Sequence, residues 1–162
     1  MNVNAGSNSV SAFAVTPRGL HLIGTASSGG TDPNSVAIAG DHLVYVLNAG
    51  SETIAGFRVG DGGLRPIPGS VRPLGAGALV PRQIQFTTDA SVLVVDEGAS
   101  NTIDTFVVGS NEKAGQAITT PSVGGAPSGS TSTAPITSWS PTPRSLPAKA
   151  ARPPTTSLVT AP

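Results

Sequence analysis

The sequence contains no cysteine and has few charged or aromatic residues. Without cysteine there is no disulfide framework and no thiolate metal site, so the redox compartment stays open. Only 11% of the 162 residues are charged, and 4% are aromatic. No apolar run approaches the roughly 20 residues that cross a bilayer, so we expect no membrane partner. Residues 1–4, Met-Asn-Val-Asn, lack the basic and apolar regions of a signal peptide, which makes the cytoplasm the default expectation.

Glycine (20 residues) and proline (15 residues) are abundant instead. Such turn formers between short apolar runs favour many short strands, and no segment free of them has helical periodicity. Five arginines and all nine acidic residues precede Lys113, a net charge of −4, and the four remaining basic residues give +4. This change marks a boundary, but the basic residues are too few and too interrupted by proline to indicate nucleic-acid binding.

One strand–turn–strand unit occurs three times. Its clearest copy is Leu43 to Val59, in which an apolar run, the turn Asn-Ala-Gly-Ser and a second strand follow one another. Similar units surround Phe13 and Phe106. Phe13 and Phe57 are 44 residues apart, and Phe57 and Phe106 are 49 apart, which is the spacing of one propeller blade per repeat.

Four short strands for each repeat predict an all-β chain, a partial β-propeller of about two and a half antiparallel blades. We expect residues 1–125 to form it. A part-blade covers 1–27, a first complete blade covers 33–74 and a second covers 81–123. The strands expected in the complete blades are 34–38, 42–47, 53–59 and 64–67, then 82–86, 91–95, 102–107 and 116–119.

Residues 126–162 consist mainly of Ser, Thr, Pro, Ala and Gly, which predicts a disordered tail or stalk. An alternative hypothesis is that this tail is an out-of-frame translation of the next blade. If the serine codons are TCN, a one-base shift makes Ser128, Ser130 and Ser132 apolar, in the register of positions 34, 36 and 38. The same shift makes positions 138–140 apolar, in the register of 44–46. The sequence of the gene decides between the two.

The repeats resemble those of the lactonase-family β-propellers, which include 6-phosphogluconolactonase-like and muconate-lactonizing proteins. The resemblance is carried by residues 46–51, Val-Leu-Asn-Ala-Gly-Ser, by residues 53–57, Thr-Ile-Ala-Gly-Phe, and by residues 81–86, Pro-Arg-Gln-Ile-Gln-Phe. The last is similar to the family pattern Pro-Arg-His-x-x-Phe followed by Asn-Glu. Arg82 and Glu97 match this pattern, whereas Gln83 replaces its His and Asp96 its Asn. The resemblance implies a ring of about seven blades around a channel that holds the site.

Lactone hydrolysis needs a polarised carbonyl and an activated water. By the resemblance, Arg82 is the candidate to polarise the carbonyl, Glu97 to act as base and Gln83 to contact the substrate. The alternatives are that Arg82 only lines the channel and that Glu97 is a solvated turn residue. His21 and His42 are isolated and predict surface or strand-end positions. We expect no metal and no cofactor.

Three functions remain open at this stage. The chain can be a truncated lactonase-like protein, with ancestral hydrolysis of a sugar lactone such as 6-phosphogluconolactone and no activity of its own. It can be a non-catalytic propeller used for binding, which Gln83 favours. It can also be a secreted repeat protein with a Ser/Thr/Pro stalk. Exposed blade edges predict self-association in each case.

Overall fold

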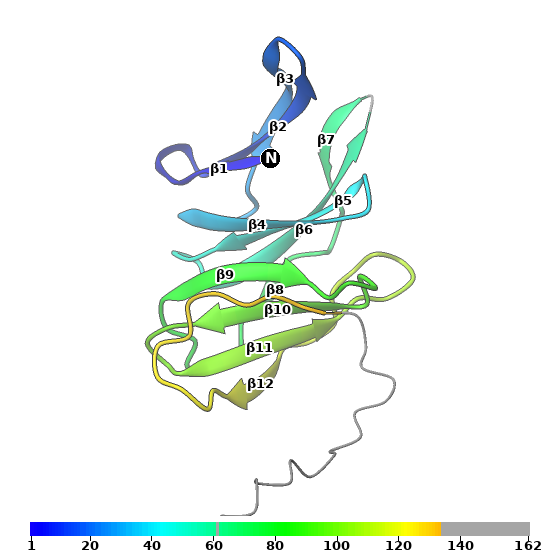
Figure 1. Cartoon of the computed structure of the whole chain (residues 1–162). Helices are drawn as coiled ribbons and strands as arrows, with labels where there is room; N and C mark the ends of the chain where they lie inside the picture. Colours follow the sequence, from blue (N-terminus) through cyan, green and yellow to red (C-terminus); the bar gives the residue numbers. More distant parts are fainter. Residues whose placement is uncertain (61, 134–162) are drawn as a thin grey trace, which may run out of the picture.

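The computed structural model describes residues 1–60 and 62–133, and these residues form an all-β architecture, which confirms the predicted fold class. Three antiparallel sheets follow one another along the molecule in a propeller-like series (Figure 1). Of the predicted tail, residues 126–162, the part from 134 to 162 lies outside the described residues. Residues 130 and 132 are described and form hydrogen bonds with Gln83 and Phe86. Among the described residues, no helix is long and apolar enough to cross a membrane.

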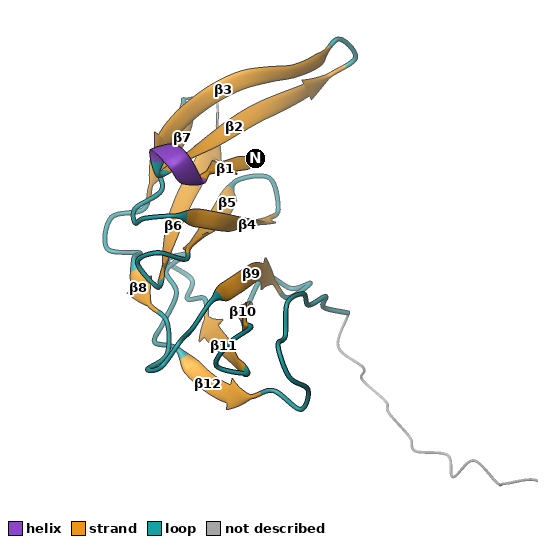
Figure 2. Cartoon of the chain, turned by 90° about the vertical axis from the view of Figure 1, so that its left-hand side faces the viewer, coloured by secondary structure: helices purple, strands orange, loops and turns teal. Residues whose placement is uncertain are grey.

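The first sheet has the strand order β1-β2-β3 and ends in a long hairpin that projects from the molecule (Figure 2). A single 3-10 turn, η1, follows its first strand. The bounds are β1 (Asn2–Asn4), η1 (Ala5–Ser7), β2 (Ser9–Thr16) and β3 (Gly19–Ser27).

The second sheet has the order β4-β5-β6-β7, and a short strand, β8, also pairs with β6. The third has the order β9-β10-β11-β12. The bounds in the second sheet are β4 (Pro33–Ala39), β5 (Leu43–Asn48), β6 (Thr53–Gly60), β7 (Gly63–Pro66) and β8 (Arg72–Pro73). Those in the third are β9 (Pro81–Phe86), β10 (Val92–Glu97), β11 (Thr102–Val107) and β12 (Ile118–Pro121).

One turn has the same construction in all three sheets, between β1 and β2, between β5 and β6 and between β10 and β11. Asn8, Glu52 and Asn101 each adopt a left-handed backbone, with φ of 50°, 51° and 56°. The carbonyl of each then accepts a hydrogen bond from the linker that leaves the sheet, at 2.9, 2.9 and 2.8 Å. The donors are the backbone N–H groups of Ser28, Leu74 and Ser122. The sequence repeat is therefore also a repeat of backbone geometry.

Two apolar layers lie between the sheets. Tyr45, Leu47 and Ile54 of the second sheet pack toward the third, together with Phe86 and Phe106. The second layer joins the other face of the second sheet to the first. It contains Val10, Val44, Val46, Ala55, Phe57 and Leu64.

Tyr45 is the largest fully buried side chain and explains the glycine opposite it. A Cβ at position 56 would lie 2.8 Å from Cζ of Tyr45, so the ring packs directly on the Gly56 backbone. The Tyr45 hydroxyl donates to the carbonyl of Glu112 (3.0 Å) and accepts from the N–H of Ala114 (2.8 Å). One side chain therefore ties the second sheet to a loop of the third.

Substitution of Phe13 and Phe106, which occupy equivalent positions in the first and third sheets, tests this packing. Phe106 is 0% exposed in the layer between the second and third sheets, whereas Phe13 in the projecting hairpin is only half-buried. We expect Phe106→Ala to lower the free energy of unfolding by about 3–5 kcal/mol, because it removes a ring and leaves a cavity. Phe13→Ala should cost about 1 kcal/mol, since less surface is lost. Urea denaturation of both variants measures the difference, and equal losses would contradict the layered core.

Candidate functional site

The innermost strands of the second and third sheets, β4 and β9, lie side by side and form a groove of about 500 Å³. Within the described part of the chain, each of them pairs with one neighbouring strand, so the other edge carries peptide groups without a ladder partner. Ser35, Arg82, Gln83 and Gln85 are among the side chains that line the groove. The groove therefore offers neutral donors and acceptors together with one cation.

Two hydrogen bonds hold the strands in this position. The side-chain amide of Asn34 donates to the carbonyl of Pro81 at 2.6 Å, and the N–H of Ile84 donates to Oγ of Ser35 at 3.2 Å. Both bonds use the free edge of a strand, so they set the spacing of the groove without closing it.

Arg82, the predicted carbonyl-polarising residue, is exposed at one end of β9 and lines the groove. Its side chain crosses the backbone of Gly98, where an added Cβ would clash with the guanidinium. Within the described residues no carboxylate lies within ion-pair distance of it. The guanidinium thus keeps its charge available to a ligand.

Gln83, the predicted substrate contact, also lines the groove, but its amide has a protein partner. Its Nε2 donates to the carbonyl of Ser130 at 2.9 Å. Residues 130–132 lie beside β9, and Oγ of Ser132 donates to the carbonyl of Phe86 at 3.1 Å. Gln83 therefore holds the end of the described chain against the third sheet.

Glu97, the predicted base, is 0% exposed and does not line the groove, so it is not a solvated turn residue. Burial, followed by the neighbouring Asp104 carboxylate, raises the pKa of Glu97 to about 7. Asp104 itself accepts from the Gly75 N–H and from Oγ1 of Thr119, both at 2.5 Å. Glu97 therefore belongs to a buried carboxyl pair between sheet and linker.

The strand register also revises which residue of the third sheet corresponds to Asn48. Asn48 pairs with Thr53 and Pro33, and Glu97 pairs with Thr102 and Pro81. Glu97, not Asp96, therefore stands at the position of the turn asparagine, because the loop between Phe86 and Val92 is longer than the loop between Ala39 and Leu43. Asp96 is also buried, at 2% exposure.

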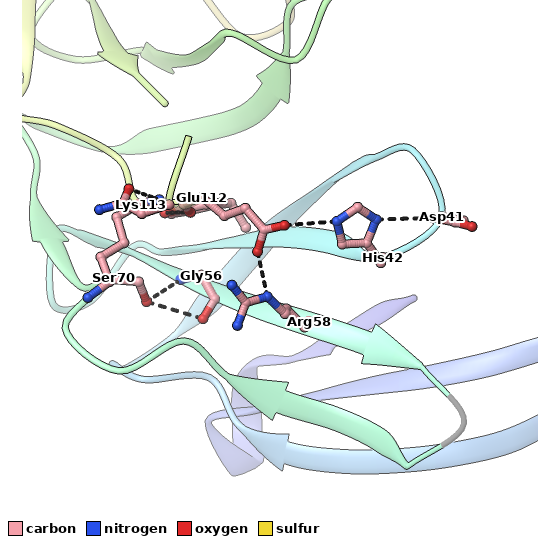
Figure 3. Close-up of polar contacts among 9 residues, drawn as sticks. Asp41, His42, Gly56, Arg58, Ser70, Glu112 and Lys113 are labelled. Carbon is pink, nitrogen blue, oxygen red and sulfur yellow. Dashed lines mark hydrogen bonds and ion pairs between the residues drawn. The ribbon is translucent and has the colours of Figure 1, made fainter. Parts of the chain in front are cut away.

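A second polar cluster joins the two sheets away from the groove (Figure 3). Glu112 accepts from Nε2 of His42 at 2.9 Å and from Nε of Arg58 at 2.5 Å, and His42 also contacts Asp41. The hydrogen bonds to Glu112 and then to Asp41 raise the pKa of His42, and the bonds from His42 and Arg58 lower the pKa of Glu112. His42 is half-exposed next to β5, as predicted.

Sequence reasoning missed this cluster because its members are far apart in the chain. His42 and Glu112 are separated by 70 residues, and neither belongs to a motif. Glu112 has a left-handed backbone, with φ of 64°, in the loop that follows β11. The cluster acts as a clasp between sheets, and no group of three or more metal-type ligands gathers anywhere in residues 1–60 and 62–133.

Comparison with solved structures defines the class of fold. A protein of unknown function from Desulfotomaculum acetoxidans matches with a TM-score of 0.61 at 18% identity, over 71% of this chain and 36% of its own. A protein from Lactobacillus plantarum matches with a TM-score of 0.60 at 17% identity, over 71% and 36%. This chain is thus similar in fold to about a third of each larger all-β protein. No protein-family model and no curated protein matches it.

The buried Glu97 makes stability depend on pH. An unfolded glutamate ionises near pH 4.5, whereas the native carboxyl holds its proton up to a pKa of about 7. Raising the pH through this window therefore favours the unfolded state, and the free energy of unfolding should fall between about pH 4.5 and 7. Glu97→Gln should remove most of this fall and be more stable than the natural chain at pH 8. Thermal denaturation at pH 4.5 and 8 measures the effect.

Glu52 is the matched control, since it is an exposed glutamate in the equivalent turn of the second sheet. Glu52→Gln should leave the pH dependence of stability unchanged. If Glu97→Gln and Glu52→Gln behave alike, the buried carboxyl pair is not the source.

Proposed function

We propose that this chain is a partial propeller related to the lactonase family, and that the groove between β4 and β9 binds a sugar lactone such as 6-phosphogluconolactone without hydrolysing it. The observation that carries the proposal is the composition of the groove. A free guanidinium, Arg82, stands beside uncharged polar side chains and unpaired strand edges.

The chemistry of a sugar lactone suits this lining. Its ring hydroxyls both donate and accept hydrogen bonds, as do the peptide groups of two free strand edges. Its carbonyl oxygen or an attached phosphate is an acceptor for Arg82, and hydrogen bonds to a charged group are the stronger ones. Ser35 supplies a hydroxyl on the opposite wall of the groove.

The lining also explains why we propose binding rather than hydrolysis by this chain. Hydrolysis needs a group that takes a proton from water. Gln83 stands where the family pattern has histidine, and an amide has no such proton-accepting role at neutral pH. Glu97 is buried against Asp104 and lies outside the groove lining. Arg82 alone can bind and polarise a carbonyl.

Hydrolysis by a completed ring is the second candidate. The repeats resemble those of lactonases, and this chain covers only 36% of each of the two solved structures of similar fold. In such an assembly, other blades would have to supply the base that this groove lacks. Use of the chain as a secreted stalk protein rests on the tail of residues 126–162, of which 134–162 lie outside the described part.

The proposal is tested with glucono-1,5-lactone and 6-phosphogluconolactone as probes. We expect saturable binding by ligand-observed NMR, and release of acid no faster than in buffer. Arg82→Gln should weaken binding by about tenfold or more, because a charge-assisted hydrogen bond is lost from the site.

Arg18→Gln is the matched control, since Arg18 is an exposed arginine at the tip of the projecting hairpin, away from the groove. It should leave binding unchanged. Absence of saturable binding, or equal binding by both variants, would refute the groove as the site. Acid release above the spontaneous rate would instead favour the hydrolytic candidate.

A further inference from the structure

We infer that this chain binds a second copy of itself head to tail, with the first sheet of one copy packed on the outer face of the third sheet of the other. The inference is independent of lactone binding. The first and third sheets lie at opposite ends of the series (Figure 1). The internal repeat identifies what covers each of them, because the molecule already contains two interfaces between the same kinds of sheet.

The first exposed face belongs to the β2–β3 hairpin. Val15 is 84% exposed, Leu20 68% and Leu22 58%. The pairing of Val15 with Leu20 in this hairpin corresponds to that of Val59 with Leu64 in the second sheet. Leu64 is only 9% exposed, because the first sheet covers it. The hairpin therefore presents the surface that a preceding sheet covers elsewhere in the molecule.

The complementary face belongs to β10 and β11. In the second sheet, Tyr45 and Ile54 are fully buried beneath the third sheet. The corresponding residues of the third sheet are Val94 and Ile103, and both remain partly exposed. Val94 and Ile103 thus present the surface that a following sheet covers elsewhere in the molecule.

Among the described residues the first sheet lacks an innermost strand, and the end of the described chain lies where such a strand would stand in a further sheet. The first sheet has three strands. Among residues 1–60 and 62–133, no strand pairs with the outer side of β1, the side on which β4 pairs with β5 in the second sheet. Residues 126–133 of another copy can supply a strand at the outer side of β1. Within their own copy they run parallel to β9, as β9 runs parallel to β4. Gln83 donates a hydrogen bond to the carbonyl of Ser130, and Ser132 donates one to the carbonyl of Phe86.

The backbone that leads into residues 127–133 has the same conformation as the backbone that leads into β4 and β9. The residues before Pro33, Pro81 and Pro127 all have a left-handed backbone, with φ of 50°, 54° and 52°. The side chain of Asn101 accepts from the N–H of Ala126 at 2.6 Å, as that of Asn8 accepts from the N–H of Asp32 at 2.8 Å. Residues 126–133 therefore occupy the innermost-strand position of a further sheet.

A second copy completes that sheet. Its β1 edge lies against residues 127–131 of the first copy, and its hairpin face lies on Val94 and Ile103. The contact reproduces the two internal interfaces, so it covers free strand edges and apolar side chains together. Because the two surfaces differ, the contact is heterologous.

Sedimentation velocity of the full chain tests this inference. The natural chain should associate in a concentration-dependent manner, with species of at least twice the monomer mass. Leu20→Asp, in the hairpin, and Ile103→Asp, in β11, should each weaken association by about tenfold or more, because each places a charge in the apolar contact. A mixture of the two variants should restore a 1:1 dimer through the one contact that remains intact.

Leu79→Asp is the control, since Leu79 is a 52% exposed leucine on the linker between the second and third sheets. It should associate like the natural chain. Val15→Asp provides a second hairpin variant at a more exposed position, and circular dichroism checks that each variant keeps its strands. A mixture that stays monomeric would show that the contact is not head to tail. A monomeric natural chain would overturn the inference, including the case in which its hairpin is covered by another part of the same chain.

Discussion

The structure depends on burial of both faces of the second sheet. Tyr45, Leu47 and Ile54 pack toward the third sheet, while Val44, Val46 and Phe57 pack toward the first. β5 is therefore buried along its whole length, whereas the β2–β3 hairpin is largely exposed. A sheet of this kind has no core of its own, and its stability comes from the neighbouring sheets.

The same packing fixes the polar parts of the molecule. Tyr45 brings its ring edge-on to Phe86, with ring centres 6.0 Å apart, and its hydroxyl to the loop that carries Glu112. This aligns β9 beside β4, which creates the groove that carries Arg82. It also places the Glu112 carboxylate within reach of His42 and Arg58. The groove and the clasp are thus consequences of how two sheets stack.

The sequence predicted the strands better than their surroundings. Turn residues mark the ends of β5, β6 and β11 in the chain itself, and β5 is a continuous apolar run, so their positions could be read locally. The burial of Glu97 could not, because Val-Val-Asp-Glu-Gly reads as a strand that runs into a solvated turn. Its environment is set by Asp104 on the neighbouring strand β11 and by the linker at Gly75, which precedes the third sheet in the chain. The clasp at Glu112 and the placement of residues 126–133 beside β9 likewise depend on contacts between sheets.

Hydrogen exchange resolved along the chain tests the central claim most directly, at a protein concentration low enough to keep the chain monomeric. If stability comes from neighbouring sheets, amide protection should be highest in β5, β6 and β10, which lie between or against other sheets. It should be markedly lower in the outer half of the β2–β3 hairpin, although its strands stay paired from Phe13 and Leu22 to Thr16 and Gly19. Equal protection of the hairpin and of β5 would contradict the account, because it would mean that each sheet is stable without its neighbours.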